Sequence, residues 1–356
     1  MPLKPIPALI TRQRDPDNLE SHFSALDGVL TPNDSFYVRS HFEAPVIDPG
    51  AWRLRIEGSV HRIVDLTLTD LRGMAAQTHT AVLECAGNGR LFLKPKKDGV
   101  QWELGAVGCA RWKGVPLAAV LDRAGVQPGV IDVVLEGADS GTPEKADHPK
   151  AKITYSRSLP LSKARQPEVL LAYEMNGEPL TRAHGAPVRA IVPGWYAMAS
   201  VKWLRRILLI DHRFQGFWQT VDYAYWSAHD GQPPEHVPIS DIAVKSTIAQ
   251  PAGNDRIAFG APVRVFGAAW SAGAAITTVE VSVDDGKLWN AAKLIDEAHE
   301  HAWQRWEFVW RPDKPGRYTL RSRATDAAGN TQPAEHNKDH GGYIVHHTLP
   351  VVVEVE

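Results

Sequence analysis

The chain has 356 residues, of which 44% are hydrophobic and 22% charged, and its formal net charge at pH 7 is -2. This length predicts two or three domains, and the balanced charge excludes a protein-wide basic field for nucleic acid. No apolar run is long enough to span a bilayer, so we expect no membrane partner. Residues 1–7 lack the apolar core of a signal peptide, so we expect a cytoplasmic protein, or a periplasmic one if a leader has been removed.

Cysteine usage limits the metal chemistry. The chain has only Cys85 and Cys109, which excludes a disulfide framework and a structural zinc site made of cysteines alone. No CxxCH motif occurs, so no covalently attached haem is encoded and we expect no haem cofactor. If Cys85 binds a metal, the other ligands must come from elsewhere in the chain or from a cofactor.

The first two thirds of the chain mix strand and helix patterns. Alternating or β-branched apolar runs predict strands at 35–42, 52–58, 78–84, 131–136, 169–172 and 187–192. A threonine cap and a proline start predict short helices at 67–74 and 116–124. We also expect a loop at 141–151, a tight turn at Asn176-Gly177 and a linker at 231–238.

The pattern changes near residue 240. From there, short strands that alternate at period two are separated by turn residues such as Asp284-Asp285-Gly286. This spacing predicts an antiparallel β-sandwich of the immunoglobulin type, without its inter-sheet disulfide because both cysteines lie earlier. We therefore predict an α+β protein with a mixed α/β catalytic domain at 1–238 and an immunoglobulin-like β-sandwich domain at 239–356.

The stretch 83–90, Leu-Glu-Cys-Ala-Gly-Asn-Gly-Arg, is the strongest candidate for a functional site. Cys85 stands at the predicted end of a strand, and Gly87 and Gly89 allow positive φ angles and close approach of the backbone to a ligand. Arg90 adds a fixed cation, which favours the thiolate that binds metals. The alternative is a small buried thiol, which most free cysteines are, and we interpret Cys109 in that way.

Basic residues elsewhere supply weaker signals. Arg39, Arg90 and Arg189 each lie near a glycine, a histidine or a predicted strand end, where a guanidinium can bind an oxyanion or a phosphate. His184 precedes a Gly-Ala-Pro bend, and a structural histidine would fit there equally well. GxSxG, GxGxxG and Walker A motifs are absent, which argues against a serine hydrolase elbow and against those nucleotide-binding loops.

Several segments together resemble one family. Glu84-Cys85-Ala86-Gly87-Asn88 with Arg90 resembles the metal-ligand segment of the sulfite oxidase family of molybdopterin enzymes. Other segments similar to motifs of that family follow in the family's order, at 36–41, 170–177, 184–189, 192–194, 200–204 and 222–223. The resemblance covers roughly residues 30–240 and reaches the C-terminal part through its sandwich pattern.

The resemblance implies a role for each matching residue. Cys85 would be the protein's ligand to a molybdenum ion held by molybdopterin. Arg39, Arg90 and Tyr223 would line the oxyanion pocket, with Trp102 as its wall. The residues that would hold the pterin and its phosphate are Arg39, His41, Asp139, His184, Arg189, Ser200, Lys202 and Asp222.

The implied activity is the oxidation of sulfite to sulfate by a homodimer. Electrons would pass to an external acceptor such as cytochrome c, another carrier or dioxygen. The chain departs from the animal pattern at Ser40 and at Gly89. It also has no counterpart of the pocket arginine that animal enzymes take from the β module, and the stretch 299–306 holds other basic residues instead. Because of these departures, an alternative is that the chain uses the same cofactor on another substrate: nitrate, an S-oxide or a carrier-bound sulfur compound. A non-catalytic binding module is the alternative from a different class.

Overall fold

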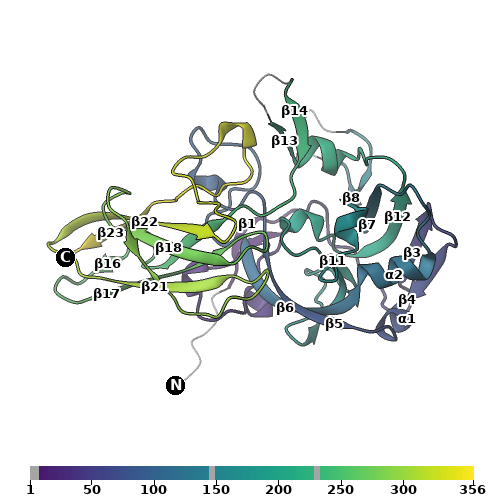
Figure 1. Cartoon of the computed structure of the whole chain (residues 1–356), viewed down its shortest axis with the longest axis horizontal. Coiled ribbons are helices and arrows are strands. Elements are labelled where there is room, and N and C mark those ends of the chain that lie inside the picture. Colours follow the sequence, from purple (N-terminus) through teal and green to yellow (C-terminus); the bar gives the residue numbers. More distant parts are fainter. Residues whose placement is uncertain (1–7, 144–148, 228–232) are drawn as a thin grey trace.

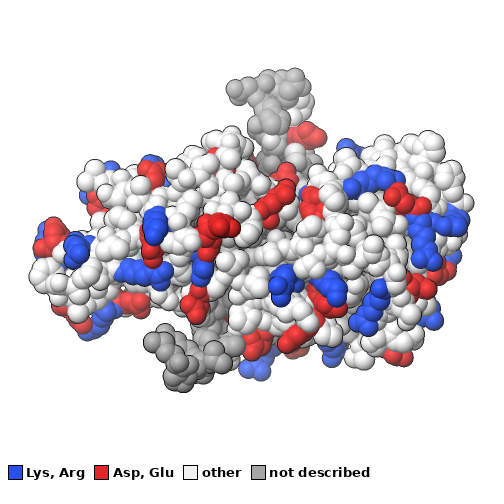
Figure 2. All heavy atoms as spheres, turned by 60° about the horizontal axis from the view of Figure 1, so that its bottom comes forward, with Lys and Arg blue, Asp and Glu red and all other residues white. Residues whose placement is uncertain are grey.

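The computed structural model describes residues 8–143, 149–227 and 233–356. Figure 1 shows a mixed module, formed by the earlier part of the chain, beside an all-β module formed by the later part. Strands dominate both modules, and no helix among these residues is long and apolar enough to cross a membrane. Figure 2 shows acidic and basic side chains intermingled over the face in view, in keeping with the formal net charge of -2.

The first sheet carries the candidate metal-ligand stretch at the end of a strand. Its strands lie in the order β10-β9-β6-β5, and β11 also pairs with β9. Their bounds are β5 Gln77–Glu84, β6 Val107–Pro116, β9 Leu170–Met175, β10 Glu178–Pro179 and β11 Arg189–Ile191. The strands predicted at 78–84, 169–172 and 187–192 are confirmed within a few residues. Because β5 ends at Glu84, Cys85 is the first residue beyond the strand.

A second sheet shares a hydrophobic core with the first. Its order is β4-β3-β12-β7-β8, in which β3 and β12 run parallel and the other neighbours antiparallel. The bounds are β3 Arg53–Gly58, β4 Val64–Thr67, β7 Asp132–Gly141, β8 Ile153–Pro160 and β12 Leu204–Ile210. The predicted strands at 52–58 and 131–136 are confirmed as β3 and β7.

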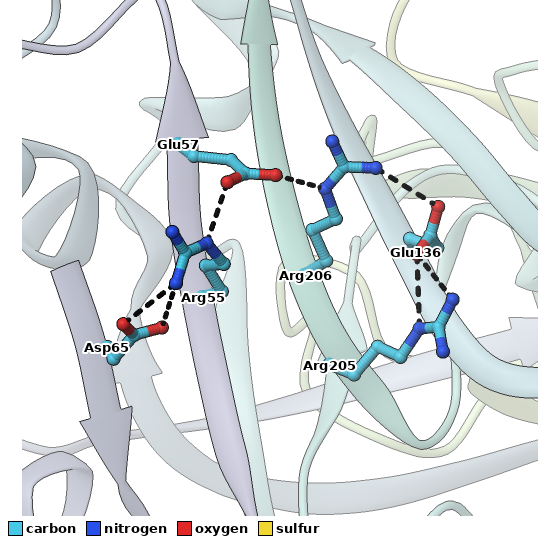
Figure 3. A network of polar contacts seen from close by, with 6 residues as sticks. All are labelled: Arg55, Glu57, Asp65, Glu136, Arg205 and Arg206. Carbon is cyan, nitrogen blue, oxygen red and sulfur yellow. Dashed lines mark hydrogen bonds and ion pairs between the residues drawn. The ribbon is translucent and has the colours of Figure 1, made fainter. Parts of the chain in front are cut away.

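Ion pairs cross the exposed face of this second sheet (Figure 3). Glu57 accepts hydrogen bonds from Arg55 at 2.7 Å and from Arg206 at 2.6 Å. Glu136 accepts one from Arg205 at 2.8 Å. Pairs of this kind, open to solvent, contribute only about 0–1 kcal/mol each. They pair opposite charges on neighbouring strands of the solvent-exposed face. Packing of the hydrophobic core contributes most of the stability of the sheet.

The helices are short and lie between strands. Helix α1 Leu68–Arg72 begins after Thr67, whose hydroxyl accepts from the Asp70 N–H while the Asp70 carboxylate accepts from the Thr67 N–H. This capping box accounts for the helix predicted at 67–74. The helix predicted at 116–124 is α2 Leu117–Ala124, and a third is α3 Leu161–Ala164. Single helical turns lie at η1 Phe23–Ala25, η2 Asn33–Ser35, η3 Arg90–Phe92, η4 Ala197–Ala199, η5 Trp218–Asp222 and η6 Lys338–His340.

Two predicted segments fold differently. The run at 35–42 is not a strand, because only Val38 finds a partner, exchanging backbone hydrogen bonds of 2.9 and 2.8 Å with Leu19. Within the predicted linker at 231–238, β14 Glu235–Pro238 pairs with β13 Ala224–Ser227 as a hairpin. Residues 228–232, and 144–148 of the loop predicted at 141–151, lie outside the described residues. A further small hairpin is formed by β1 Ile10–Gln13 and β2 Asn18–Glu20.

The C-terminal module is a two-sheet sandwich, as predicted. One sheet has the order β15-β17-β21-β20, with β15 Lys245–Gln250, β17 Val263–Trp270, β20 Lys293–Leu294 and β21 Gln304–Trp310. The other has the order β16-β23-β22-β18-β19, with β16 Arg256–Ile257, β18 Ile276–Ser282, β19 Asn290–Ala291, β22 Gly316–Asp326 and β23 Val351–Val355. Side chains from both sheets, including Trp306 and Leu320, form its core.

The two modules also share buried contacts with each other. Trp270 and Trp303 of the sandwich module belong to the same hydrophobic cluster as the core of the mixed module. The Val82 N–H in β5 donates to the His301 carbonyl at 2.9 Å, which satisfies part of the open edge of the first sheet. The sandwich module therefore packs directly against the strand that leads to Cys85.

Candidate active site

A tight loop after β5 presents Cys85. The Cys85 N–H donates to the Ala106 carbonyl at 2.9 Å, and the Cys85 carbonyl accepts from the Asn88 N–H at 2.8 Å. The Ala86 carbonyl accepts from the Ile344 N–H of the sandwich module at 2.8 Å. The loop is thus fixed by backbone hydrogen bonds from both modules, and the buried thiol lies on the wall of a cavity.

Glycines let Arg90 fold tightly against this loop. A Cβ at Gly87 would overlap the guanidinium, and one at Gly99 would lie 2.6 Å from its Nη1. Gly89 has a φ of 98°, whereas Gly87 is outside the left-handed region, so the predicted positive φ holds only for Gly89. The Arg90 Nη1 donates to the Val100 carbonyl at 2.9 Å. Arg90 is therefore a positioned cation and not a mobile surface side chain.

Two adjoining cavities open beside Cys85. The inner one measures about 60 Å³ and the outer one about 1120 Å³, and Arg39, Cys85 and Tyr223 line both. Nine of the predicted site residues line the inner cavity, namely Arg39, His41, Cys85, Asp139, His184, Arg189, Ser200, Lys202 and Tyr223. The outer cavity adds two more, Arg90 and Asp222. The fold thus brings most of the predicted residues to one place.

Trp102 is the predicted site residue that lines neither cavity. Its indole is fully buried in a hydrophobic cluster, 6.5 Å between ring centroids from Tyr37, which does line the inner cavity. Trp102 therefore supports the wall from behind and does not form it. The stretch 299–306 also reaches neither cavity, and Arg305 is held there by Asp296 at 2.8 Å.

The inner cavity is lined by cations with neutral partners. Lys202 Nζ donates to the Ser40 hydroxyl at 3.0 Å and to the Ala183 carbonyl at 2.9 Å. Arg189 donates to the carbonyls of His184 at 3.2 Å and Ser200 at 3.0 Å, while its buried Nε has no hydrogen-bond partner among the described residues. These cations have donors to spare for a bound anion.

The pKa values in this cavity reflect burial and crowding of positive charge. Burial lowers the pKa of Arg189 to about 10, and burial together with the Arg189 charge lowers the pKa of Lys202 to about 7. The same two causes lower the pKa of His184 to about 4. Burial raises the pKa of Asp139, whose Oδ1 has no hydrogen-bond partner in the described part of the chain. An anion in this cavity would stabilise the charged forms of its cations.

The outer cavity gathers hydrogen-bond donors near Cys85. Arg39 donates to Asn18 Oδ1 at 3.2 Å, and the Tyr223 hydroxyl lies 2.7 Å from His41 Nε2. Burial raises the pKa of Tyr223, and burial followed by the Arg39 charge lowers the pKa of His41, so both side chains are neutral near pH 7. Fixed guanidinium groups with a neutral hydroxyl suit a small oxyanion.

Comparison with known proteins identifies the family. The family models for an oxidoreductase molybdopterin binding domain and a Mo-co oxidoreductase dimerisation domain match residues 41–218 and 236–353. The sulfite oxidase of Arabidopsis thaliana is 33% identical over 361 residues, which cover 92% of this chain and 88% of that protein. The chain belongs to the sulfite oxidase family.

Two further proteins show how far the similarity extends. The mitochondrial sulfite oxidase of Macaca fascicularis is 36% identical over 346 residues, which cover 92% of this chain but only 62% of that protein. In structure, the chain is similar to the sulfane dehydrogenase SoxCD from Paracoccus pantotrophus, with a TM-score of 0.81 and 29% identity over 99% of this chain and 88% of that one. The core and both modules of this chain therefore follow the family fold.

The cavity walls fit the molybdopterin cofactor of this family. The inner cavity offers spare donors on Arg189 and Lys202 for a phosphate, and an unpaired carboxylate oxygen on Asp139 for a heterocycle that donates hydrogen bonds. Cys85 supplies a soft thiol of the kind that redox-active metals bind. Among the described residues, no group of three or more His, Cys, Asp or Glu side chains is arranged to hold a metal ion.

Tyr343 is a residue of the outer cavity that the sequence did not predict. Tyr343, from the sandwich module, places its ring 5.0 Å from the guanidinium carbon of Arg90 and 5.2 Å from the Tyr223 ring. The adjacent Gly342 carbonyl accepts from Arg90 Nε at 2.8 Å. Only the Gly-Gly-Tyr bend at 341–343 marks this segment in the sequence, and a bend alone does not indicate a site.

Proposed function

We propose that the chain oxidises sulfite to sulfate with molybdenum held by molybdopterin. The observation that carries this proposal is the meeting of Cys85 with Arg39, Arg90 and Tyr223 at one cavity. In the overall reaction, sulfite and water give sulfate, two protons and two electrons. When bound, the cofactor supplies the oxygen-atom transfer and takes up the two electrons.

The residues of the inner cavity are proposed to hold this cofactor. Cys85 would bind the metal, and Arg189, Lys202 and His184 would contact the pterin and its phosphate, with Asp139 accepting from the heterocycle. Arg39, His41 and Ser200 lie on the same walls, Asp222 lies on the wall of the outer cavity, and all four are assigned to the same task. Their charges and donors would orient the cofactor in the cavity.

The outer cavity is proposed to bind the substrate anion. The guanidinium cations of Arg39 and Arg90 would offset the charge of sulfite and of the sulfate that forms. The Tyr223 hydroxyl stays protonated, and His41 Nε2 is its hydrogen-bond partner at 2.7 Å. A proton released at this hydroxyl has a neutral imidazole within reach.

The partners follow from the same proposal. The electrons would pass singly to an external acceptor, either a cytochrome c-type carrier or dioxygen. A homodimer through the sandwich module is supported by the match of residues 236–353 to a dimerisation domain. Two-fold pairs are also the commonest symmetric oligomers.

A second candidate keeps the cofactor and changes the substrate. The similarity to a sulfane dehydrogenase favours a carrier-bound sulfur compound over nitrate or an S-oxide. Sulfite turnover in steady-state assays, with little activity on the other substrates, would exclude this candidate.

The test of the proposed function replaces the metal ligand. Cys85→Ser should give a folded protein without sulfite-dependent reduction of cytochrome c or ferricyanide, because a serine hydroxyl is a poor ligand for a soft metal. Cys109→Ala is the matched control: this thiol is buried away from both cavities, and burial raises its pKa to about 12. Near-normal sulfite oxidation by Cys85→Ser, with unchanged molybdenum content, would refute the ligand assignment.

A further inference from the structure

A buried ion pair joins the two modules beside the Cys85 loop. Glu84 is the last residue of β5 in the mixed module, and Lys245 is the first residue of β15 in the sandwich module. Lys245 Nζ lies 2.8 Å from Glu84 Oε1, and the two side chains are only 2% and 1% exposed. This is the most deeply buried ion pair in the described part of the chain, and none of the residue roles above uses it.

The lysine holds both ends of the loop that presents Cys85. Its ammonium group donates to the Glu84 carboxylate before the cysteine and to the Asn88 carbonyl after it, the latter at 3.1 Å. The Asn88 side chain donates to the same carboxylate at 3.1 Å and accepts from the Ala106 N–H at 3.1 Å. One buried cation therefore closes a ring of hydrogen bonds that joins the two ends of the Cys85 loop.

The carboxylate is held equally firmly from the other side. The Trp270 indole N–H donates to Glu84 Oε2 at 2.8 Å, so both carboxylate oxygens are satisfied. Trp270 and Lys245 both come from the sandwich module, whereas Glu84 belongs to the mixed module. The charge beside Cys85 is therefore determined by contacts between the modules.

Stability alone does not account for such a pair. Removing two charges from water costs about as much as their attraction returns, and neutral replacements of similar volume are often as stable or more so. A glutamine and an apolar side chain would fill the same space. The pair places two opposite charges, with no net charge, at a fixed position next to the thiol.

We infer that Lys245 is a positioning residue for the metal centre: it fixes the Cys85 loop and neutralises Glu84, and so sets the charge that the bound metal experiences. This inference rests on the proposed function only in taking Cys85 as the metal ligand, and it is independent of the substrate. In a buried site, an uncompensated positive charge nearby favours the reduced metal, and a negative one favours the oxidised metal.

The test measures the midpoint potential of the molybdenum in the holoenzyme. Glu84→Gln keeps the shape of residue 84 and an acceptor oxygen for Lys245 and Asn88, but it loses the acceptor for the Trp270 N–H. It leaves the Lys245 charge uncompensated, so the potential should shift to more positive values. The double variant Glu84→Gln/Lys245→Met is neutral again and should return to the wild-type potential. The titration uses chemical mediators without sulfite and follows the one-electron-reduced metal by EPR, so failure of the proposed substrate does not affect it.

Asp65→Asn serves as the control for removal of a carboxylate in general. Asp65 pairs with Arg55 at 3.0 Å on the exposed face shown in Figure 3, where solvent screens the charge. The molybdenum midpoint potential of Asp65→Asn should equal that of the wild type. Equal potentials for Glu84→Gln and the double variant would overturn the inference.

A second measurement uses the apoprotein and needs no cofactor. At a fixed pH near neutrality, iodoacetamide should alkylate Cys85 several-fold faster in Glu84→Gln than in the wild type, because the uncompensated cation favours the thiolate. The double variant should return to the wild-type rate, and Cys85→Ser gives the background from Cys109. Identical rates in the single and double variants would contradict the inference, even if neither variant takes up metal.

Discussion

At the scale of single residues, the site is built from buried cations whose hydrogen-bond partners are neutral, although the Asp139 charge also acts on Lys202. Lys202 shows this clearly. Its ammonium group contacts only neutral oxygens, those of Ser40 and Ala183, and burial with the Arg189 charge lowers its pKa to about 7. A bound anion would restore the charged form, which links the protonation of this lysine to ligand binding.

We therefore expect the apoprotein to bind sulfate more weakly as the pH rises. The pKa of Lys202 is lowered to about 7, so the lysine is a cation below that pH and loses its charge above it. At about pH 8 roughly a tenth of it stays protonated, and affinity should fall up to about tenfold from its value near pH 6. Sulfate suits this calorimetric test because it stays a dianion throughout the range.

The control for this prediction is Lys202→Arg. A guanidinium stays protonated at both pH values, so the step in sulfate affinity should disappear while binding persists. The same step in Lys202→Arg and in the wild type would assign the titration to another group. Affinity independent of pH in the wild type would show that Lys202 stays charged without a ligand.

The sequence located most of the candidate site, and its errors have physical causes. Cys85 and Arg90 lie in one local motif, so spacing alone places them together. Trp102 was misplaced because a motif marks a position in the chain and not the direction of the side chain. Tyr343 and Lys245 were missed because their contacts come from the packing of the second module, for which no nearby sequence pattern exists.

At the scale of elements, the turn between β9 and β10 organises the lead-in to the site. Asn176 and Gly177 have φ angles of 53° and 87°, as the Asn-Gly pair predicted. The Asn176 side chain donates to the Thr31 carbonyl at 2.9 Å and to Asn33 Oδ1 at 2.9 Å. The Asn33 carbonyl in turn lies 3.2 Å from His184 Nε2, on the wall of the inner cavity.

Asn176→Ala should lower the free energy of unfolding by about 2–3 kcal/mol. About 1 kcal/mol comes from placing alanine in the left-handed region, which asparagine tolerates better, and the rest from the lost hydrogen bonds. Asn176→Gly loses the same hydrogen bonds but keeps the backbone conformation, so it should be about 1 kcal/mol more stable than the alanine variant. Denaturant titration compares the two, and equal stabilities would remove the conformational part of this argument.

Strands with a partner were predictable, and a β-prone segment without one was not. Segments 52–58 and 78–84 became β3 and β5 because each alternates or is apolar and lies beside another strand. The run at 35–42 has the same propensity, yet its neighbours in space are cavity walls, so only Val38 pairs. The hairpin at β14 was missed because the three prolines of 231–238 suggested a linker, although an edge strand tolerates proline.

At the scale of the whole molecule, the two modules are not separable bodies joined by a linker. Trp303 of the sandwich module is 2% exposed, and its ring centroid lies 6.2 Å from that of Phe23 in the lead-in and 6.2 Å from that of Trp270. These aromatic side chains join the core that the two sheets of the mixed module share. A change in the sequence pattern near residue 240 indicated a second module, but that pattern does not show that the hydrophobic core continues from one module into the other.

Trp303→Ala should therefore destabilise both modules together. Truncating a buried tryptophan costs about 3–5 kcal/mol through lost burial and the cavity left behind. Calorimetry should show one transition that moves to lower temperature as a whole, because the cavity opens in the core that both modules share. Val309→Ala is the matched control, since Val309 lies in the same module but is 60% exposed, and its effect should stay within about 0.5 kcal/mol. Two separate transitions, with only the later one shifted in Trp303→Ala, would show instead that each module folds on a core of its own.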